Sequence, residues 1–164
     1  MTQPAAALAP SARIGHVHLK VADLERAIAF YADVLGFEVQ ARLGSEAAFL
    51  GADGYHHHIG LNTWRSKGGT PAPEGHTGLF HTALLYASRA DLATAVKRVI
   101  DAGFPVMGAS DHGVSEAIYF NDPDGNGVEL YCDRDPAEWP RHEDGSLQMY
   151  SRPLPLEQLL SEAR

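Results

Sequence analysis

Two histidines and one glutamate stand where they could bind a metal ion together. His16 lies in the segment GHVHLKV, His81 lies in the similar segment FHTALLY, and Glu129 lies in the last strand-like stretch. Side chains alternate between the two faces of a strand, and apolar neighbours flank these residues, so each is expected to point away from the packed face. Two imidazoles and one carboxylate form the facial triad suited to non-haem Fe(II). Any one of them alone would fit a structural role equally well.

An internal repeat makes the two histidines equivalent. GHVHLKV and FHTALLY match at an offset of 65 residues, while LGFEV and AGFPV match at an offset of 67, so the second copy contains a two-residue insertion between these segments. A unit of this length is too short to fold alone, and the two modules are expected to complete one core. The polar faces of their sheets would then enclose a cleft that holds the triad.

The patterning of each module predicts one helix among short strands. In module one, the alternation of residues 14–21 predicts a strand, and apolar residues at helical spacing predict a helix within 22–36, with Asp23 as N-cap and Gly36 as its end. Module two repeats the order, and its helix ends at Gly103. The other predicted elements are strands at 37–43, 47–50, 56–64, 80–87, 106–109, 117–120 and 128–132 and a helix at 91–102.

These elements predict an α+β fold in which two βαβββ modules pair into one open barrel-like sheet around a metal cleft. The domain spans 14–134, with a connector at 65–78 that separates module one (14–64) from module two (79–134). Residues 1–13 form an N-terminal extension, and residues 135–164 form a C-terminal arm that ends in a short helix from Leu156.

Composition narrows the class of protein. The net charge is −8, which disfavours nucleic acid and anionic membrane surfaces as partners, and mean hydropathy is −0.21 with no apolar stretch long enough to cross a membrane. The single cysteine, Cys132, excludes an intramolecular disulfide and is expected to pack in the core. With no secretory signal in the first ten residues, the chain is expected to be cytoplasmic, and the long arm favours a homo-oligomer.

The sequence resembles the vicinal oxygen chelate superfamily, which includes glyoxalase I, extradiol dioxygenases and bleomycin-resistance proteins. The resemblance covers residues 14–134 and rests on GHVHLKVADLERAIAFYADVLGF and DHGVSEAIYFNDPDGNGVELYCDR. EAIYFNDPDGNGVELYCDR and HHHIGLNTW are similar to the single-domain catechol 2,3-dioxygenase-like branch. The resemblance implies paired βαβββ modules around a metal cleft, with ligands at His16, His81 and Glu129.

The same resemblance implies catalytic roles for three further residues. Ile59 and Leu61 belong to the buried face of the predicted strand, so alternation places His58 on the polar face that is expected to enclose the cleft. Extradiol enzymes carry a histidine acid–base catalyst in the fourth strand, which falls on His58, with His57 as the register-shifted alternative. They place a substrate-contacting tyrosine at the position of Tyr119, across the NDPDGNG turn from Glu129. His112 is expected to reach the same cleft.

The leading hypothesis is an Fe(II)-dependent extradiol dioxygenase that cleaves a catecholic aromatic ring with O2. The alternatives are a lyase or isomerase of the glyoxalase type, with Mn, Zn or Ni, and a ligand-sequestering resistance protein. A four-ligand isomerase needs another ligand near Ile59 or Gly60, and neither can bind a metal, although a register shift of one residue would bring His58 to this position. His18 shares the face of His16 and is the alternative ligand.

Overall fold

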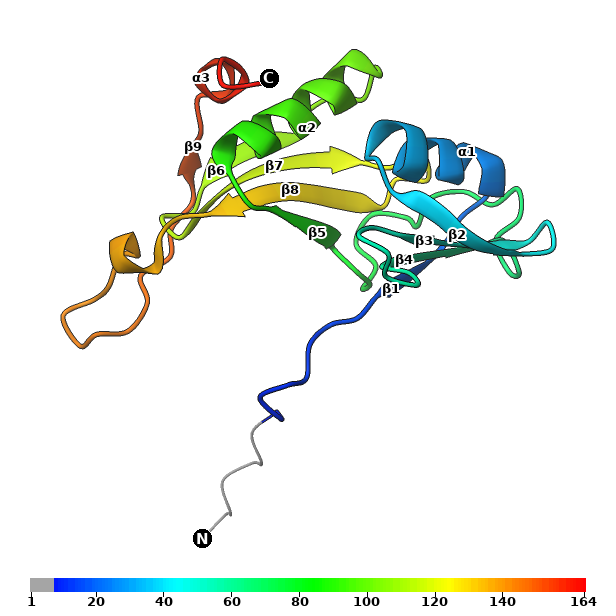
Figure 1. Ribbon diagram of the computed structural model, residues 1–164, viewed down its shortest axis with the longest axis horizontal. Coiled ribbons are helices and arrows are strands. Elements are labelled where there is room, and N and C mark those ends of the chain that lie inside the picture. Colours follow the sequence, from blue (N-terminus) through cyan, green and yellow to red (C-terminus); the bar gives the residue numbers. More distant parts are fainter. Residues whose placement is uncertain (1–7) are drawn as a thin grey trace, which may run out of the picture.

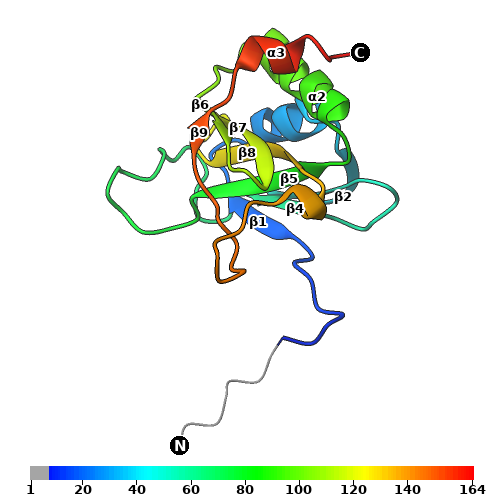
Figure 2. The same ribbon diagram turned by 90° about the vertical axis from the view of Figure 1, so that its left-hand side faces the viewer.

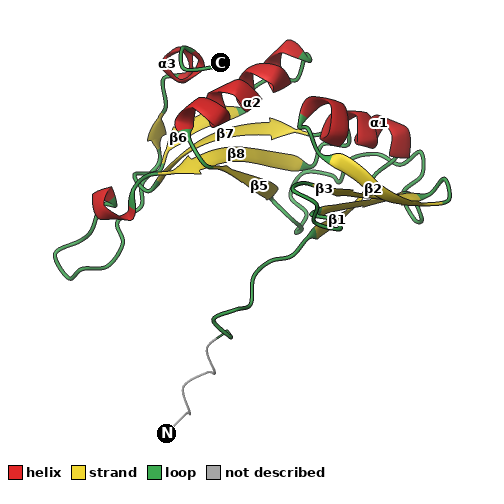
Figure 3. Ribbon diagram, viewed as in Figure 1, coloured by secondary structure: helices red, strands yellow, loops and turns green. Residues whose placement is uncertain are grey.

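The strands of the protein form two mixed sheets, one for each half of the chain, in a computed structural model that describes residues 8–164 (Figures 1 and 3). The first sheet has the order β1-β4-β3-β2 and the second β5-β8-β7-β6-β9, and the first strand of each module runs parallel to its last. The strands are β1 (Val17–Lys20), β2 (Glu38–Leu43), β3 (Ala47–Gly51), β4 (Ile59–Asn62), β5 (His81–Tyr86), β6 (Gly108–Asp111), β7 (Ser115–Asn121), β8 (Gly127–Asp133) and β9 (Arg152–Pro153). The two sheets do not close into a barrel, which confirms the open α+β fold.

The helices of both modules cover the same side of the sheets (Figure 1). Helix α1 (Leu24–Ile28) continues as a π-helix over Ala29–Val34, and α2 (Arg89–Asp101) occupies the matching place in module two. Asp23 caps α1 as predicted, since its carboxylate accepts from the backbone N–H of Arg26 at 3.0 Å. The opposite face of the sheets is left without helices.

Strand alternation places apolar side chains under the helices and polar ones on the open face. In β1, Leu19 is buried between the exposed His18 and Lys20. In β8, Val128 and Leu130 pack in the core. Cys132 is also buried there, as expected, and burial raises the pKa of its thiol. One apolar cluster includes residues of both modules, so the modules do complete a common core.

The strands differ from their predicted bounds by up to three residues, and the differences at β4 and β6 have an identifiable cause. β4 begins at Ile59 rather than at residue 56, because the chain before it is occupied by a tight turn in which Asp53 has a φ of +51°. β6 spans Gly108–Asp111 rather than 106–109, because its pairing partners in β7 begin opposite Gly108. The first difference moves His56, His57 and His58 out of the strand, so strand alternation does not determine where their side chains point.

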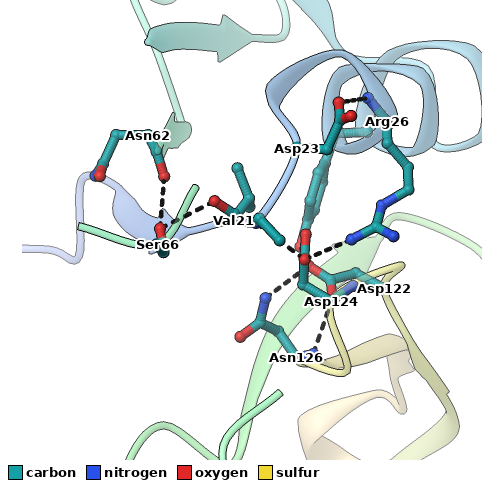
Figure 4. A network of polar contacts seen from close by, with 10 residues as sticks. Val21, Asp23, Arg26, Asn62, Ser66, Asp122, Asp124 and Asn126 are labelled. Carbon is teal, nitrogen blue, oxygen red and sulfur yellow. Dashed lines mark hydrogen bonds and ion pairs between the residues drawn. The ribbon is translucent and has the colours of Figure 1, made fainter. Parts of the chain in front are cut away.

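The two modules are joined by polar contacts between α1 and the turn that connects β7 to β8 (Figure 4). The Asp124 carboxylate accepts from the backbone N–H of Ala22 at 3.0 Å and from the Arg26 guanidinium at 2.7 Å. The Asp122 carboxylate accepts from the N–H groups of Asp124 and Asn126 within the turn. The NDPDGNG segment is therefore the predicted turn and also a contact between modules.

The C-terminal arm returns to the second sheet, an arrangement that periodicity does not predict. It passes through a short 3-10 turn (Pro136–Glu138), pairs β9 with β6, and ends in α3 (Leu156–Leu160), which packs on α2 (Figure 2). Leu159 of α3 is fully buried. The helix from Leu156 is confirmed.

The N-terminal extension was predicted over residues 1–13, and residues 1–7 lie outside the part that the structure describes. Within residues 8–164, no helix combines the length and the apolar character that crossing a membrane requires.

Candidate active site

Module two brings His81 and Glu129 into direct contact on the open face of its sheet. His81 Nε2 lies 2.7 Å from Glu129 Oε2, and only 9% of Glu129 is exposed. The close approach of β5 to β8 depends on Gly127, which pairs with His81: a Cβ at this position would lie 2.2 Å from the Phe80 carbonyl oxygen. A carboxylate accepts from an N–H, so in the neutral ring the proton lies on Nε2 and Nδ1 is the acceptor nitrogen. That nitrogen is buried and has no hydrogen-bond partner in the described part of the chain.

Tyr119 and His112 extend this pair into a chain of four polar side chains. Tyr119 lies directly across from Glu129 in the β7–β8 pair, and its hydroxyl is 3.5 Å from Glu129 Oε1. The same hydroxyl lies 2.8 Å from His112 Nε2. Burial, together with the Glu129 carboxylate, raises the pKa of Tyr119 to about 12, so the hydroxyl is protonated at neutral pH.

Module one contributes a separate cluster of imidazoles around Phe49. The rings of His16 and His57 lie 4.4 Å apart between centroids, and His57 lies 5.1 Å from Phe49. Burial, followed by the nearby imidazoles with His16 first, lowers the pKa of His57. His57 is therefore held in its neutral form, in which an imidazole can bind a metal or accept a proton.

The His18 ring lies over the neighbouring strand β4 of its own sheet. A Cβ on Gly60, its partner in β4, would lie 2.9 Å from His18 Cγ, so the ring occupies the space that a side chain at position 60 would fill. The ring meets Phe49 edge-on at 5.9 Å. Burial lowers the pKa of His18, and His16 adds to this effect.

His58 points to different neighbours from those that alternation predicts. Its Nδ1 accepts from the backbone N–H of Ala52 at 3.3 Å, and its ring lies 4.7 Å from Tyr55 and 6.3 Å from Phe37 between centroids. The regular alternation begins only at Ile59, so it does not govern His58. His57 is the histidine of this run whose ring faces His16.

A cleft of about 510 Å³ lies between the modules, where β1 and β5 are the end strands of their sheets. His16 and His58 line it from module one, and Thr82, Leu84 and Tyr86 line it from module two. Its lining includes none of His81, Glu129, Tyr119 and His112, so this cleft does not join the two parts of the candidate site.

The expected metal ligands are brought together only in part. His81 and Glu129 touch, while the ring contact described for His16 is with His57. Among residues 8–164, no three histidine, cysteine, aspartate or glutamate side chains are grouped closely enough to hold a metal ion as they stand. The donor chemistry of His81 and Glu129 nevertheless fits a divalent metal, since a buried imidazole nitrogen without a partner and a largely buried carboxylate are two of the three donors of a facial triad.

One residue of this site is not predicted by the sequence. The backbone carbonyl of Tyr150 lies 2.9 Å from His112 Nδ1. Tyr150 belongs to the C-terminal arm, and a main-chain acceptor leaves no trace in residue type or spacing. Only the tertiary course of the arm reveals it.

Comparison with known proteins is consistent with this geometry. The family described as "Glyoxalase/Bleomycin resistance protein/Dioxygenase superfamily" matches residues 13–130. A protein of Bacillus subtilis named catechol-2,3-dioxygenase is 39% identical over 151 residues, which cover 92% of this chain and 52% of that protein. A Rhodococcus globerulus protein named biphenyl-2,3-diol 1,2-dioxygenase 3 is 34% identical over 74% of this chain and 63% of that protein. The chain thus spans between half and two thirds of these relatives.

Solved structures share the fold at low sequence identity. A glyoxalase/dioxygenase from Nostoc punctiforme aligns with a TM-score of 0.64 at 19% identity, over 81% of this chain and all of that one. A lactoylglutathione lyase from Agrobacterium tumefaciens aligns with a TM-score of 0.59 at 24% identity, over 76% of this chain and 96% of that one. The chain belongs to the glyoxalase, bleomycin resistance protein and dioxygenase superfamily.

Proposed function

We propose that this protein is an Fe(II)-dependent extradiol dioxygenase that cleaves a catecholic aromatic ring beside its two hydroxyl groups with O2. The observation that carries the proposal is the continuous chain of His81, Glu129, Tyr119 and His112 on the open face of module two. Its residue types match the ligand pair and the substrate-contacting groups that an extradiol site needs. Two relatives at 34% and 39% identity are named as dioxygenases of vicinal diols, which supports the same reaction class.

In this proposal His16, His81 and Glu129 hold the metal. Iron supplies electron transfer between a chelated catechol and O2, chemistry that protein side chains alone do not provide. With three protein ligands, the metal would keep positions free for both oxygens of a catechol and for O2. For His16 to join the other two ligands, its ring has to turn from His57 toward module two.

The residues around the metal would handle the protons of the substrate. A catechol that binds through its oxygens would lose one hydroxyl proton and keep the other, and a neutral imidazole beside His16 is suited to accept the proton that is lost. We assign this role to the histidine run before β4, with His57 favoured over His58 because His57 faces His16. Tyr119 would hydrogen-bond a substrate oxygen and hold the ring in place, which lowers the barrier through proximity.

The same sheet argues against a glyoxalase-type isomerase with Mn, Zn or Ni. Gly60 occupies the place in β4 where a fourth ligand would stand, and the His18 ring fills the space above it. The likeness to a lactoylglutathione lyase, at 24% identity, concerns the fold. Fold alone does not decide function in a scaffold that hosts several activities.

The test is a direct assay of iron-loaded protein. Protein purified anaerobically and loaded with Fe(II) is expected to take up O2 when catechols are added, and to form yellow ring-opened products that carry both oxygen atoms by mass. If fully iron-loaded protein consumes no O2 with any catechol of a broad panel, the function is wrong. Turnover of a glutathione hemithioacetal by Zn- or Ni-loaded protein would support the isomerase instead.

Homo-oligomerisation is also expected. Leu79, Phe80 and Leu85 are 63%, 87% and 57% exposed around β5, an apolar group suited to burial between subunits. Light scattering of the purified protein would give the mass, and a monomer at micromolar concentration would contradict this expectation.

A further inference from the structure

Both ring nitrogens of His112 have partners, and those partners determine where its proton lies. Nδ1 is 2.9 Å from the Tyr150 carbonyl oxygen, and Nε2 is 2.8 Å from the Tyr119 hydroxyl. A carbonyl can only accept a hydrogen bond, so Nδ1 must carry the proton. In the neutral ring Nε2 is then an acceptor, and the Tyr119 hydroxyl donates to it.

This tautomer sets the direction of the Tyr119 hydroxyl. The hydroxyl has one proton and two nearby acceptors, and His112 Nε2 at 2.8 Å is closer than Glu129 Oε1 at 3.5 Å. Because the Tyr119 hydroxyl donates its hydrogen bond to His112 Nε2, the lone pairs of its oxygen remain free to accept a hydrogen bond from the open face. A tyrosine in this state accepts a hydrogen bond from a ligand hydroxyl, as a diol substrate can offer. The opposite tautomer of His112 would reverse the direction and make Tyr119 a donor.

The Tyr150 carbonyl is held against His112 by close packing at Gly113. Gly113 has a φ of +79°, and a Cβ there would lie 2.7 Å from Tyr150 Cε1 and 2.9 Å from Pro140 Cγ. Only glycine allows both this backbone conformation and this approach. The backbone N–H of Tyr150 also donates to the His112 carbonyl at 3.3 Å, so the two residues are joined at two points.

The arm is anchored on both sides of Tyr150. Before it, the Trp139 indole N–H donates to the Arg134 carbonyl at 2.9 Å. After it, the Arg152 guanidinium stacks 4.1 Å from the Tyr150 ring centroid, and β9 pairs with β6. Figure 2 shows the arm passing from the loop below the sheet, along β9, to α3. The position of the carbonyl is thus fixed by the fold of the whole arm.

We propose that the C-terminal arm contributes to the site. Its Tyr150 carbonyl holds His112 in the Nδ1–H tautomer, and this tautomer makes Tyr119 an acceptor for a substrate hydroxyl. Gly113 and Tyr150 are positioning residues that act through His112. The catalytic meaning of this arrangement rests on the proposed function, whereas the tautomer itself does not.

Imidazole NMR of the full-length, ¹⁵N-labelled protein tests the tautomer without any substrate. Spectra are recorded with and without Zn²⁺, which keeps the protein diamagnetic, and the His112 signals are assigned by their loss in His112→Gln. The wild type is expected to show a single Nδ1–H tautomer at His112. In Gly113→Ala, displacement of Tyr150 is expected to give a mixture of tautomers or the Nε2–H form.

Gly145→Ala is the matched control. Gly145 lies in the C-terminal arm, as Tyr150 does, and its φ of +84° is close to that of Gly113. Alanine therefore introduces similar backbone strain there, but no atom lies within 4 Å of the added Cβ. It is expected to keep the wild-type tautomer. If Gly113→Ala does not fold, Tyr150→Ala takes its place, with Tyr150→Phe as the conservative variant that retains the ring and the tautomer.

The inference is overturned if wild-type His112 is in the Nε2–H form, or if His112 keeps one unchanged Nδ1–H tautomer in both Gly113→Ala and Tyr150→Ala. In iron-loaded protein, Gly113→Ala is expected to lower kcat by up to roughly 10²-fold at unchanged iron content, the effect of a misplaced catalytic group. If the tautomer shifts as expected but no catechol is turned over, the proposed function fails and the inference about the arm stands.

Discussion

Tyr31 of module one donates a hydrogen bond to Asp122 of module two, with 3.0 Å between Tyr31 Oη and Asp122 Oδ2. Both side chains are buried at the seam. Asp122 lies at the start of the turn after β7, and Glu129 lies in β8 beyond that turn. The contact therefore ties the strand that carries a candidate ligand to the helix of the other module. Burial, with the Asp122 carboxylate next in effect, raises the pKa of Tyr31 well above its usual value.

Removing the hydroxyl of Tyr31 is expected to destabilise the protein. Tyr31→Phe leaves Asp122 short of a buried partner and should lower the free energy of unfolding by about 1–3 kcal/mol. Because the folded-state pKa of Tyr31 is raised, its contribution is present below the unfolded pKa of about 10 and is lost as pH rises above it. Urea unfolding at pH 7 and at pH above 10 measures both effects.

The exposed Tyr55 provides the control for that experiment. Tyr55→Phe should change stability by no more than about 0.5 kcal/mol. Equal losses in the two variants would show that the contact at the seam contributes nothing specific.

Iron retention depends on three side chains if the proposed triad is correct. His16→Ala, His81→Ala and Glu129→Ala should each abolish iron binding in folded protein, because each removes one of only three protein donors. Metal analysis after anaerobic loading and desalting measures the effect. His18→Ala is the control and should keep its iron, since its ring lies over Gly60. Normal iron content in folded His81→Ala would contradict the assignment, and His18 would then be tested as the ligand.

The acid–base histidine can be identified by separating rate from metal content. His57→Ala is expected to lower ring opening by roughly 10²–10⁴-fold while iron is retained, the usual contribution of a positioned proton-transfer group. His58→Ala tests the alternative, and the exposed connector residue His76 supplies a control. If His58→Ala lowers the rate more than His57→Ala does, the His58 ring must leave its hydrogen bond to the Ala52 N–H during turnover. Loss of metal from either variant would indicate a fourth ligand and favour the isomerase.

Tyr119→Phe should slow turnover without releasing iron, because it removes a hydrogen bond to the substrate and no metal donor. With its pKa raised to about 12, Tyr119 stays protonated across the neutral range. The rate profiles of wild type and variant should therefore run parallel between pH 6 and about pH 9. A variant that has lost its iron would place Tyr119 in the metal site instead.

The sequence alone was sufficient for the repeat, for the order of helices and strands within the two modules and for the sheet faces. These features depend on local periodicity, and Leu19, Leu130 and the capping residue Asp23 lie where periodicity and residue type predict. The equivalence of His16 and His81 also follows from the repeat itself. The contact between His81 and Glu129 agrees with both being on the open face, although the pairing of β5 with β8 was required to bring them together.

Tertiary structure decided the features that depend on where regular structure stops. Alternation placed His58 on the polar face of its sheet, but the tight turn after Gly51 delays β4 to Ile59, and the ring that lies beside His16 is that of His57. No pattern of residues predicts that the arm returns to place the Tyr150 carbonyl on His112, because the partner is a main-chain atom that every residue carries. Periodicity reports which face a side chain occupies within an element. The distance between elements, and the contacts made by turns and backbone, are set only when the whole chain packs.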